Sequence, residues 1–298
     1  MINFISFIDW NPQSYLFEVA GFKVHIYSLC WIVAFIVGWY LMSNIFKKEN
    51  QKKELLDPLF LYTFIGAIVG ARLGEYLFYD PSAFIERPIE VFLPVQYAPG
   101  ESAFFGLLQN YEFVGFSGLA SHGAALGVII TSYLFTRKYL QRRNVLWLLD
   151  RMAVVVPFGG AAVRIGNFYN SEIVGKASDL PWAVKFYQQS SGYGEIVARH
   201  PAQIYEAIGY VILGIIMLYL YHRTDNRKYF GALLGIFLFL LFLIRFIVEF
   251  FKENQGEEAV AQTLNIGLNN GQVLSIPFML IGLYLFISSK KRPEIEPN

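Results

Sequence analysis

Cysteine is nearly absent from this sequence, which has one, Cys30, in 298 residues. A single cysteine excludes a disulfide within the chain, a Cys-x-x-Cys redox pair and a metal site built from cysteines. Charge is also scarce: 16% of the residues are charged, against about 25% in an average soluble domain. The 24 Lys and Arg nearly balance the 23 Asp and Glu, so there is no overall basic field to attract nucleic acid. We therefore expect neither redox chemistry nor a nucleic-acid partner.

Apolar residues dominate instead. Hydrophobic residues make up 55% of the chain and its mean hydropathy is +0.41, which leaves too few charges to solvate a globular surface. A helix needs about 20 apolar residues to cross a bilayer. The sequence therefore predicts an all-α polytopic membrane protein, with one transmembrane domain over 1–298 and seven spans at about 22–45, 59–79, 119–136, 145–168, 203–222, 230–251 and 271–289.

Basic residues alternate between the two sides of the predicted membrane. They follow the first, third, fifth and seventh spans, as in Lys47, Lys48, Arg137, Lys138, Arg223, Arg227, Lys290 and Lys291. Because cytoplasmic loops carry the excess of Lys and Arg, we expect the N-terminus outside and the C-terminus in the cytoplasm. The long connections 80–118 and 169–202 then lie on the outer face. Their aromatic residues suit a headgroup interface, although ordinary surface loops are an equal alternative.

Polar side chains inside spans are costly and mark candidate functional sites. Arg151, beside Asp150 at the inner end of the fourth span, is interpreted as structural. The candidate site residues fall near the outer ends of the spans on the predicted topology: Tyr27, Arg72, Glu75, His122, Arg164, Asn167, Gln203, Tyr205, Glu206, Arg245, Glu249 and Gln272. A proton or ion pathway would distribute such residues through the whole thickness, so this clustering favours a site at headgroup level. Snorkelling of long side chains to the interface accounts for Lys23 and Lys252. It accounts poorly for Arg164, His122 and Glu249, which have apolar neighbours on both sides.

Three of these outer residues are arginines, Arg72, Arg164 and Arg245. Arginine binds phosphate through a planar fork of donors, so they predict a site for an anionic phospholipid headgroup. Arg245 and Glu249 are four residues apart and are expected to share a helix face and pair. Taken alone, such a buried pair is equally consistent with a purely structural role. His122 is the natural general base near neutral pH, although a lone membrane histidine more often hydrogen-bonds between helices.

A polar segment follows the arginine of the fourth span. Asn167, Asn170 and Glu172 supply hydrogen-bonding groups, and Gly166 and Gly175 are expected to let the backbone approach a ligand closely. These residues extend the candidate site beyond the end of the span.

Two further features have structural alternatives. His200 precedes Pro201 at the first turn of the fifth span, where it is also explained as a residue of the loop before a helix. Gly66, Gly70 and Gly74 form a ridge of small residues on the second span, which predicts helix packing and not chemistry.

The sequence closely resembles the bacterial prolipoprotein diacylglyceryl transferases, with matches in order through all seven predicted spans. The matching stretches are Ile26-Tyr27, Gly70 to Gly74, Tyr76 to Tyr79, Ser121-His122-Gly123, Arg164 to Phe168, Asn170, Glu172, Gly175, His200-Pro201 to Glu206, Arg245 to Phe250, and Gly271-Gln272 to Pro277. The chain departs from the family pattern at four positions: Ser121 stands where phenylalanine is usual, and Ser28, Ala124 and Ser171 stand where glycine is usual.

The resemblance implies an enzyme that transfers the diacylglyceryl group of phosphatidylglycerol to the thiol of a lipobox cysteine. The product is a thioether, glycerol phosphate is released, and the reaction is the first step of bacterial lipoprotein maturation. The implied partners are phosphatidylglycerol, the signal peptides of preprolipoproteins with a lipobox cysteine, and membrane lipids. The implied location is the bacterial cytoplasmic (inner) membrane, with the active site toward the outer leaflet.

The resemblance also groups the candidate residues by role. It implies that Arg164 and Arg245 hold the phospholipid phosphate and that His122 and Tyr27 lie at the reacting centre, with Glu249, Asn167, Asn170 and Glu172 supporting them. Together with the reasoning above, we expect a catalytic group of His122, Arg245, Tyr27 and Glu249. We expect phospholipid binding by Arg164, Arg72, Asn167, Asn170, Glu172 and Gly175. We expect support from His200, Gln203, Tyr205, Glu206 and Gln272.

Several alternatives stay open at this point. The general base is His122, Tyr27 or Glu249, and the sequence does not choose among them. A transporter and an intramembrane protease are rival functions, the second because it also meets signal peptides. No cofactor is expected, and the outer cluster lacks the ligand set of a zinc site, so no metal is expected either.

Overall fold

A computed structural model describes residues 7–13, 15–19, 22–104, 106–114, 120–140, 143–253 and 267–292. The chain is mostly helical and divides into two compact units. Unit 1 combines Met1–Asn50 with Leu149–Asn298, and unit 2 is Gln51–Leu148. The expectation of a single transmembrane domain over 1–298 stays a prediction.

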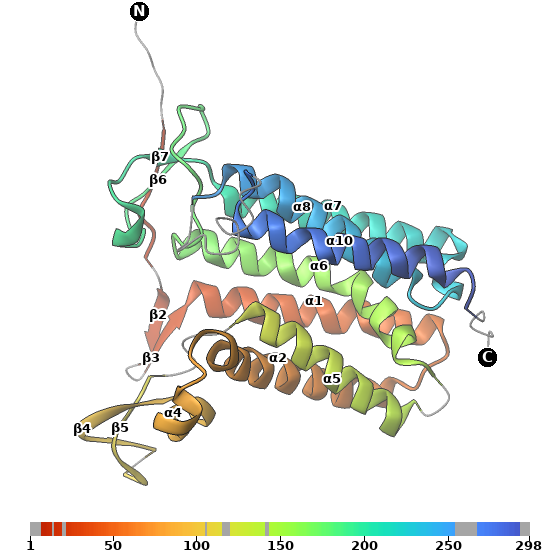
Figure 1. The fold of residues 1–298 in the computed structure, drawn as a ribbon, viewed down its shortest axis with the longest axis horizontal. Helices are drawn as coiled ribbons and strands as arrows, with labels where there is room; N and C mark the ends of the chain where they lie inside the picture. The colour runs from red at the N-terminus through yellow and green to blue at the C-terminus, as the bar shows by residue number, and fades with distance from the viewer. Residues whose placement is uncertain are drawn as a thin grey trace, which may run out of the picture. The chain divides into compact units, whose positions relative to one another are not determined.

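Five long helices form most of unit 1: α1 (Ile26–Lys48), α6 (Val145–Tyr169, whose first turn belongs to unit 2), α7 (Ala202–Arg223), α8 (Ala232–Val248) and α10 (Asn270–Ser289). Helix α8 lies beside both α7 and α10 (Figure 1). Short 3₁₀ turns, η3 (Asp225–Lys228) and η4 (Glu249–Phe251), flank α8.

Side chains satisfy the free amide groups at two helix starts in unit 1. Asn269 and Gln272 form a reciprocal capping box at the start of α10. At α8 the buried carboxylate of Asp150 accepts hydrogen bonds from the amides of Gly231 and Leu234, at 2.7 and 2.8 Å. These bonds fix where the two helices begin.

Small sheets complete unit 1. Strands β1 (Ile8–Trp10), β6 (Val184–Phe186) and β7 (Ala198–Arg199) form a three-stranded sheet in the order β1-β6-β7. Strands β2 (Tyr15–Val19) and β3 (Phe22–His25) form a hairpin that leads into α1. A 3₁₀ turn, η2 (Ser191–Tyr193), lies between β6 and β7. Segment 169–202 is therefore not only a surface loop, because Val174, Val184 and Phe186 form a buried core within it.

In unit 2, α2 (Leu56–Tyr79) packs antiparallel against α5 (Ser121–Tyr139). A Cβ added at Gly66, Gly70 or Gly74 would overlap the facing atoms of α5, so the predicted role of this glycine ridge in helix packing is confirmed. The remaining elements are η1 (Lys53–Leu55), α3 (Ala83–Glu86), α4 (Pro88–Phe92) and a hairpin of β4 (Val95–Ala103) and β5 (Leu108–Phe113).

The expected spans match the helices with some corrections. Within the described ranges, six segments are long and apolar enough to cross a membrane: Ile26–Lys48, Lys53–Leu77, Val145–Tyr169, Ala202–Arg223, Ala232–Phe251 and Asn270–Ser289. The first span was placed too early, because residues 22–25 pair as β3 before α1 begins. The expected span 119–136 corresponds to α5, which is less apolar than the others, and its residue 119 lies outside the described part of the chain. The all-α class is incomplete, since seven short strands accompany the helices in the part of the chain that the structure describes.

Candidate functional site

Glu206, on the first turns of α7, is the centre of a buried ion-pair cluster in unit 1. Its side chain is 0% exposed and contacts two cations: Arg164 Nε lies 2.6 Å from Oε2, and Lys252 Nζ lies 3.1 Å from Oε1. A carboxylate buried this deeply needs paired charges to remain ionised. Glu206 therefore joins the end of α6 and the segment after α8 to the start of α7.

Lys252 corrects two expectations. It is only 5% exposed, so it does not snorkel to the interface, and its ammonium lies 3.1 Å from both Glu206 Oε1 and Glu249 Oε2. The expected pairing of Arg245 with Glu249 is wrong. The two residues do share a helical turn, because the Glu249 amide donates to the Arg245 carbonyl. The Glu249 carboxylate nevertheless pairs with the Lys252 ammonium, three residues later, and not with the Arg245 guanidinium.

Arg245 thus differs from its neighbours. It is half-buried, its guanidinium lies 6.0 Å from the centre of the Phe242 ring, and it interacts electrostatically with Glu206. Among the described residues, no carboxylate lies within ion-pair distance of Arg245. Its guanidinium therefore keeps its donors available for an anion.

A chain of hydrogen bonds extends from Arg164 into the following turn. Arg164 Nη1 donates to Asn167 Oδ1 at 3.2 Å, and both Asn167 and Asn170 donate through Nδ2 to the Glu172 carboxylate at 2.9 Å. The Gln203 amide of α7 donates to the Glu172 carbonyl. The structure thus brings these predicted residues together.

The turn that presents Glu172 has an unusual backbone. Ser171 and Ile173 have φ angles of 55° and 57°, in the left-handed region that L side chains rarely adopt. Glycine adopts this conformation without strain, so a glycine at position 171, which the resemblance led us to expect, would suit this turn better than Ser171. Strain of this kind is retained where the surrounding contacts fix the backbone, as the Glu172 hydrogen bonds do here.

The two glycines singled out for ligand approach instead accommodate other parts of the chain. A Cβ at Gly175 would overlap His200 and the Phe251 carbonyl, because Gly175 pairs with Lys252 in a β-bridge. A Cβ at Gly166 would lie 2.7 Å from Cδ2 of Tyr27. The close approach at both positions is therefore explained by packing, and phospholipid binding by Gly175 remains untested.

Tyr27 and Gln272 lie at the same end of unit 1. The Tyr27 ring, at the start of α1, packs on Gly166 and interacts electrostatically with Arg164. Gln272 is 3% exposed and belongs to the capping box of α10, whose first turn also packs against the Glu249 carboxyl through Gly271. By capping the start of α10, Gln272 thus fixes the helical turn that packs against the Glu249 carboxyl.

His200 and Tyr205 form an aromatic group beside the cluster. Partial burial lowers the pKa of His200, so we expect a neutral ring. Trp182 Nε1 donates to the Tyr205 hydroxyl at 2.8 Å, and that hydroxyl lies 3.1 Å from His200 Nδ1. Because an indole only donates, the Tyr205 hydroxyl is free to donate to His200.

Two predicted residues belong to unit 2. Arg72 is 5% exposed and donates to the carbonyls of Glu90 and Leu93, while its guanidinium lies 4.8 Å from the centre of the Tyr76 ring. Arg72 thus holds the segment after α2. His122 is an exposed residue of the first turn of α5 and makes no hydrogen bond within the described ranges.

Sequence reasoning missed two members of the cluster. Lys252 stands three residues after Glu249, and Tyr210 stands four residues after Glu206. Tyr210 is 5% exposed and interacts electrostatically with Glu206 and Arg164. Helical spacing from Glu206 was a usable signal for Tyr210. No group of three His, Cys, Asp or Glu side chains suited to a metal occurs in the described part of the chain, and the expectation of a metal-free site stays a prediction.

Comparison with known proteins gives one family. The family model described as prolipoprotein diacylglyceryl transferase matches residues 14–288. Relatives named phosphatidylglycerol–prolipoprotein diacylglyceryl transferase include one from Bacteroides fragilis, which is 38% identical over 293 residues covering 98% of this chain and 99% of the relative. The relative from Porphyromonas gingivalis is 36% identical over 295 residues, covering 97% and 96%. The relative from Tolumonas auensis is 36% identical over 282 residues, covering 95% and 97%.

Proposed function

The chain belongs to the prolipoprotein diacylglyceryl transferase family, and from this premise we propose how its residues perform the transfer. It is a transferase of diacylglyceryl groups in lipoprotein maturation. We propose that its donor is phosphatidylglycerol and that its acceptor is the lipobox cysteine of a preprolipoprotein signal peptide. The observation that carries the function is the family match over residues 14–288.

The proposed reaction is a displacement at the glyceryl carbon that bears the phosphate. The thiolate of the lipobox cysteine is the nucleophile. Its sulfur forms a bond to that carbon, the carbon–oxygen bond breaks, and the electron pair leaves with glycerol phosphate. The thiol proton passes to a base. Because the nucleophile comes from the substrate, the enzyme needs no cysteine of its own, in keeping with the single Cys30.

We propose that Arg245 and Arg164 hold the phosphate and stabilise the charge that develops on it. Among the described residues Arg245 has no carboxylate within ion-pair distance, which supports its role. Arg164 is fixed by Glu206 and Asn167, so its direction is set before a ligand arrives. The polar turn of Asn167, Asn170 and Glu172 extends this surface, and Arg72 and Gly175 complete the proposed phospholipid-binding set.

The proposed reacting centre includes His122, Tyr27 and Glu249, any of which remains a candidate for the base. Tyr27 is supported by its interaction with Arg164. Glu249 is held by the Lys252 ammonium at 3.1 Å, which fixes the position of its carboxylate. His200, Gln203, Tyr205, Glu206 and Gln272 are proposed to position these groups.

We further propose a seven-span topology in the bacterial cytoplasmic membrane, with the N-terminus outside and the site toward the outer leaflet. Six apolar helices support a multi-pass membrane protein, and α5 would be the remaining span. The alternation of basic connections supports the orientation.

Mass spectrometry of a synthetic lipobox peptide tests the function directly. Incubation with purified enzyme and phosphatidylglycerol is expected to leave the peptide chain intact and add one diacylglyceryl mass, which a peptide with Cys→Ser at the lipobox should not acquire. Shortened peptide would indicate a protease. An unchanged peptide, together with substrate flux into liposomes that contain the protein, would indicate a transporter.

A further inference from the structure

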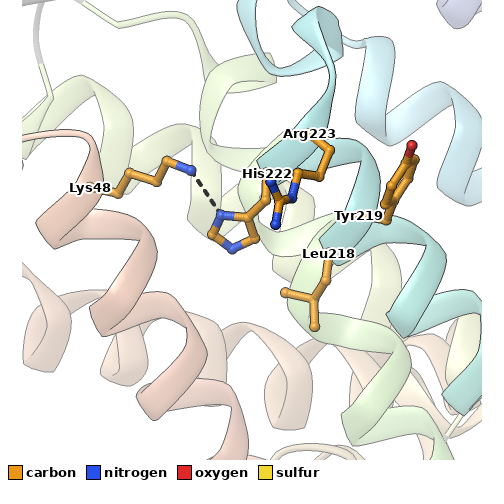
Figure 2. A pocket seen from close by; sticks show the side chains of 5 residues that line it. All are labelled: Lys48, Leu218, Tyr219, His222 and Arg223. Carbon is orange, nitrogen blue, oxygen red and sulfur yellow. Dashed lines mark hydrogen bonds between the residues drawn. The ribbon is translucent and has the colours of Figure 1, made fainter.

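A cationic pocket lies in unit 1 at the helix ends remote from the candidate site. Its volume is about 570 Å³, and it is lined by Lys48, Leu218, Tyr219, His222 and Arg223 (Figure 2). Lys48 ends α1, and the other four residues lie on the last turns of α7. On α7, sixteen residues separate Glu206 from His222, which corresponds to about 24 Å of helix rise. The pocket is therefore separate from the ion-pair cluster.

The basic groups of this pocket are not neutralised by nearby carboxylates. In the described part of the chain, no carboxylate lies within ion-pair distance of Lys48 or Arg223. The nearest candidate, Glu49, accepts hydrogen bonds from the guanidinium of Arg151 at 2.9 to 3.0 Å and from the Tyr221 hydroxyl at 2.9 Å. Asp225 of η3 pairs with Lys228. The pocket therefore carries uncompensated positive charge.

Hydrogen-bond donors also point to an anionic ligand. The Lys48 ammonium donates to His222 Nδ1 at 2.8 Å (Figure 2). An accepting Nδ1 places the ring proton of His222 on Nε2, which is then a donor. With the guanidinium of Arg223, the pocket offers three kinds of N–H donor, a set that suits the oxygens of a phosphate group.

The apolar surroundings distinguish a lipid from a soluble anion. Leu218 lines the pocket, and on the preceding turns of α7 Ile212 and Ile215 are 53% and 58% exposed. Helix α7 is one of the apolar segments able to cross a membrane, so acyl chains can lie along these side chains while a headgroup occupies the pocket. Tyr219, 61% exposed at the end of the helix, suits the level of the headgroups.

We propose that this pocket binds the phosphate group of an anionic membrane lipid, at the membrane surface opposite the transfer site. On the proposed topology this is the cytoplasmic leaflet. The bound lipid would join the ends of α1 and α7 by bridging Lys48 and Arg223, and it would not be consumed in the reaction.

Native mass spectrometry of the full-length protein in detergent tests the proposal. Phosphatidic acid is the probe, because phosphatidylglycerol also serves as the donor. Each basic side chain near a membrane surface is worth about 5-fold in affinity for anionic lipid. The double variant Lys48→Gln/Arg223→Gln is therefore expected to bind phosphatidic acid about 25-fold more weakly than the wild type.

The matched control removes two positive charges from residues that do not line the pocket. Lys290→Gln/Lys291→Gln follows α10 and changes two exposed lysines, and it is expected to bind phosphatidic acid with unchanged affinity. Equal weakening in the control would overturn the proposal in favour of diffuse attraction. Phosphatidylcholine binding as tightly as phosphatidic acid, or inorganic phosphate competing at the same concentration as the lipid, would overturn it as well.

A separate measurement shows whether the variants fold. The double variant is expected to retain diacylglyceryl transfer, since neither residue belongs to the proposed transfer site. The conservative variant Arg223→Lys keeps the charge and is expected to keep affinity within about 2-fold, given that affinity follows charge. Loss of phosphatidic acid binding in Arg223→Lys with activity intact would contradict the role of charge in this pocket.

Discussion

Two arginines of the candidate site differ in their freedom to bind substrate. Arg164 is tied to Glu206 at 2.6 Å and to Asn167 at 3.2 Å, so removing it leaves the buried Glu206 with Lys252 as its one remaining close cation. Such a change destabilises a protein by several kcal/mol, on the order of 3 to 5. Arg245 has no comparable structural partner among the described residues. Substitution of Arg245 is therefore the clearer test of phosphate binding.

Arg245→Ala is expected to reduce kcat/KM for phosphatidylglycerol by about 100-fold or more, the usual effect of removing a group that stabilises transition-state charge. Arg245→Lys keeps the charge but loses the planar fork, and is expected to recover part of the activity. Rates from lipobox-peptide mass spectrometry, with thermal unfolding of each variant, measure both effects. Full activity in Arg245→Ala would show that the phosphate is held elsewhere.

His122→Gln tests the general base. If His122 accepts the thiol proton, the amide cannot replace it, and transfer is expected to fall by about 100-fold or more. His25→Gln is the matched control, because His25 is an exposed residue just before α1 that has no side-chain capping bond. Near-normal transfer in His122→Gln would exclude His122 as the base and favour Tyr27 or Glu249.

At the residue scale, the sequence predicted the members of the cluster better than their partners. Arg164 and Glu206 are conspicuous because polar groups are rare within apolar helices, and the structure places them in contact. Two cations lie within one helical turn of Glu249, Arg245 before it and Lys252 after it, and helical spacing alone does not choose between them. The structure pairs Glu249 with Lys252.

At the scale of elements, the contact between α2 and α5 depends on the absence of side chains. Gly66 and Gly70 of α2 face Gly123 and Gly127 of α5, and at each position an added Cβ would overlap facing backbone or side-chain atoms. Because lipid gives no hydrophobic drive for helix association, close backbone packing of this kind is a main source of stability between such helices.

Gly70→Ala should therefore destabilise unit 2, even though alanine favours helix. Its Cβ would overlap the Gly123 carbonyl, and overpacking of this kind costs about 1 to 3 kcal/mol. Gly159→Ala on α6 is the matched control, since its Cβ would lie 3.6 Å from Ala34 Cβ, an ordinary contact. Thermal unfolding in detergent should show a lower midpoint only for Gly70→Ala, and equal midpoints would contradict tight packing at this crossing.

The strands were beyond the reach of the sequence patterns. Pairing of β1 with β6 joins residues such as Trp10 and Phe186, which are far apart in the sequence. A pairing between such distant segments leaves no local pattern of hydrophobic residues from which it could be predicted. Strand β7 has two residues and is stabilised by its neighbours. Apolar runs of helical length, by contrast, predict helices through their own composition, which is why the helices were found and the sheets were not.

At the scale of the whole molecule, basic residues gather at one end of unit 1. At the other end Arg164, Glu206, Glu249 and Lys252 neutralise each other, and Arg245 is a cation there without a carboxylate in ion-pair distance among the described residues. At the basic end, Lys48 and Arg223 have no carboxylate partner in the described part of the chain, and the adjoining sequence adds Lys47 and Arg227. Basic clusters at helix ends are typical of the side of a membrane protein that faces the cytoplasm, which supports the proposed orientation.

Cysteine labelling tests this orientation, and the near-absence of cysteine makes it simple. In a Cys30→Ser background, Asp179→Cys places a thiol in the exposed segment between α6 and α7, and Lys291→Cys places one just after α10. With the N-terminus outside, a membrane-impermeant maleimide is expected to label Asp179→Cys in intact cells and Lys291→Cys only after permeabilisation. Labelling of both thiols after permeabilisation controls for access. The reverse pattern would show the opposite topology. The transfer site and the cationic pocket lie in the same unit at opposite ends of α7, so the transfer site would then face the cytoplasm and the pocket would lie in the outer leaflet.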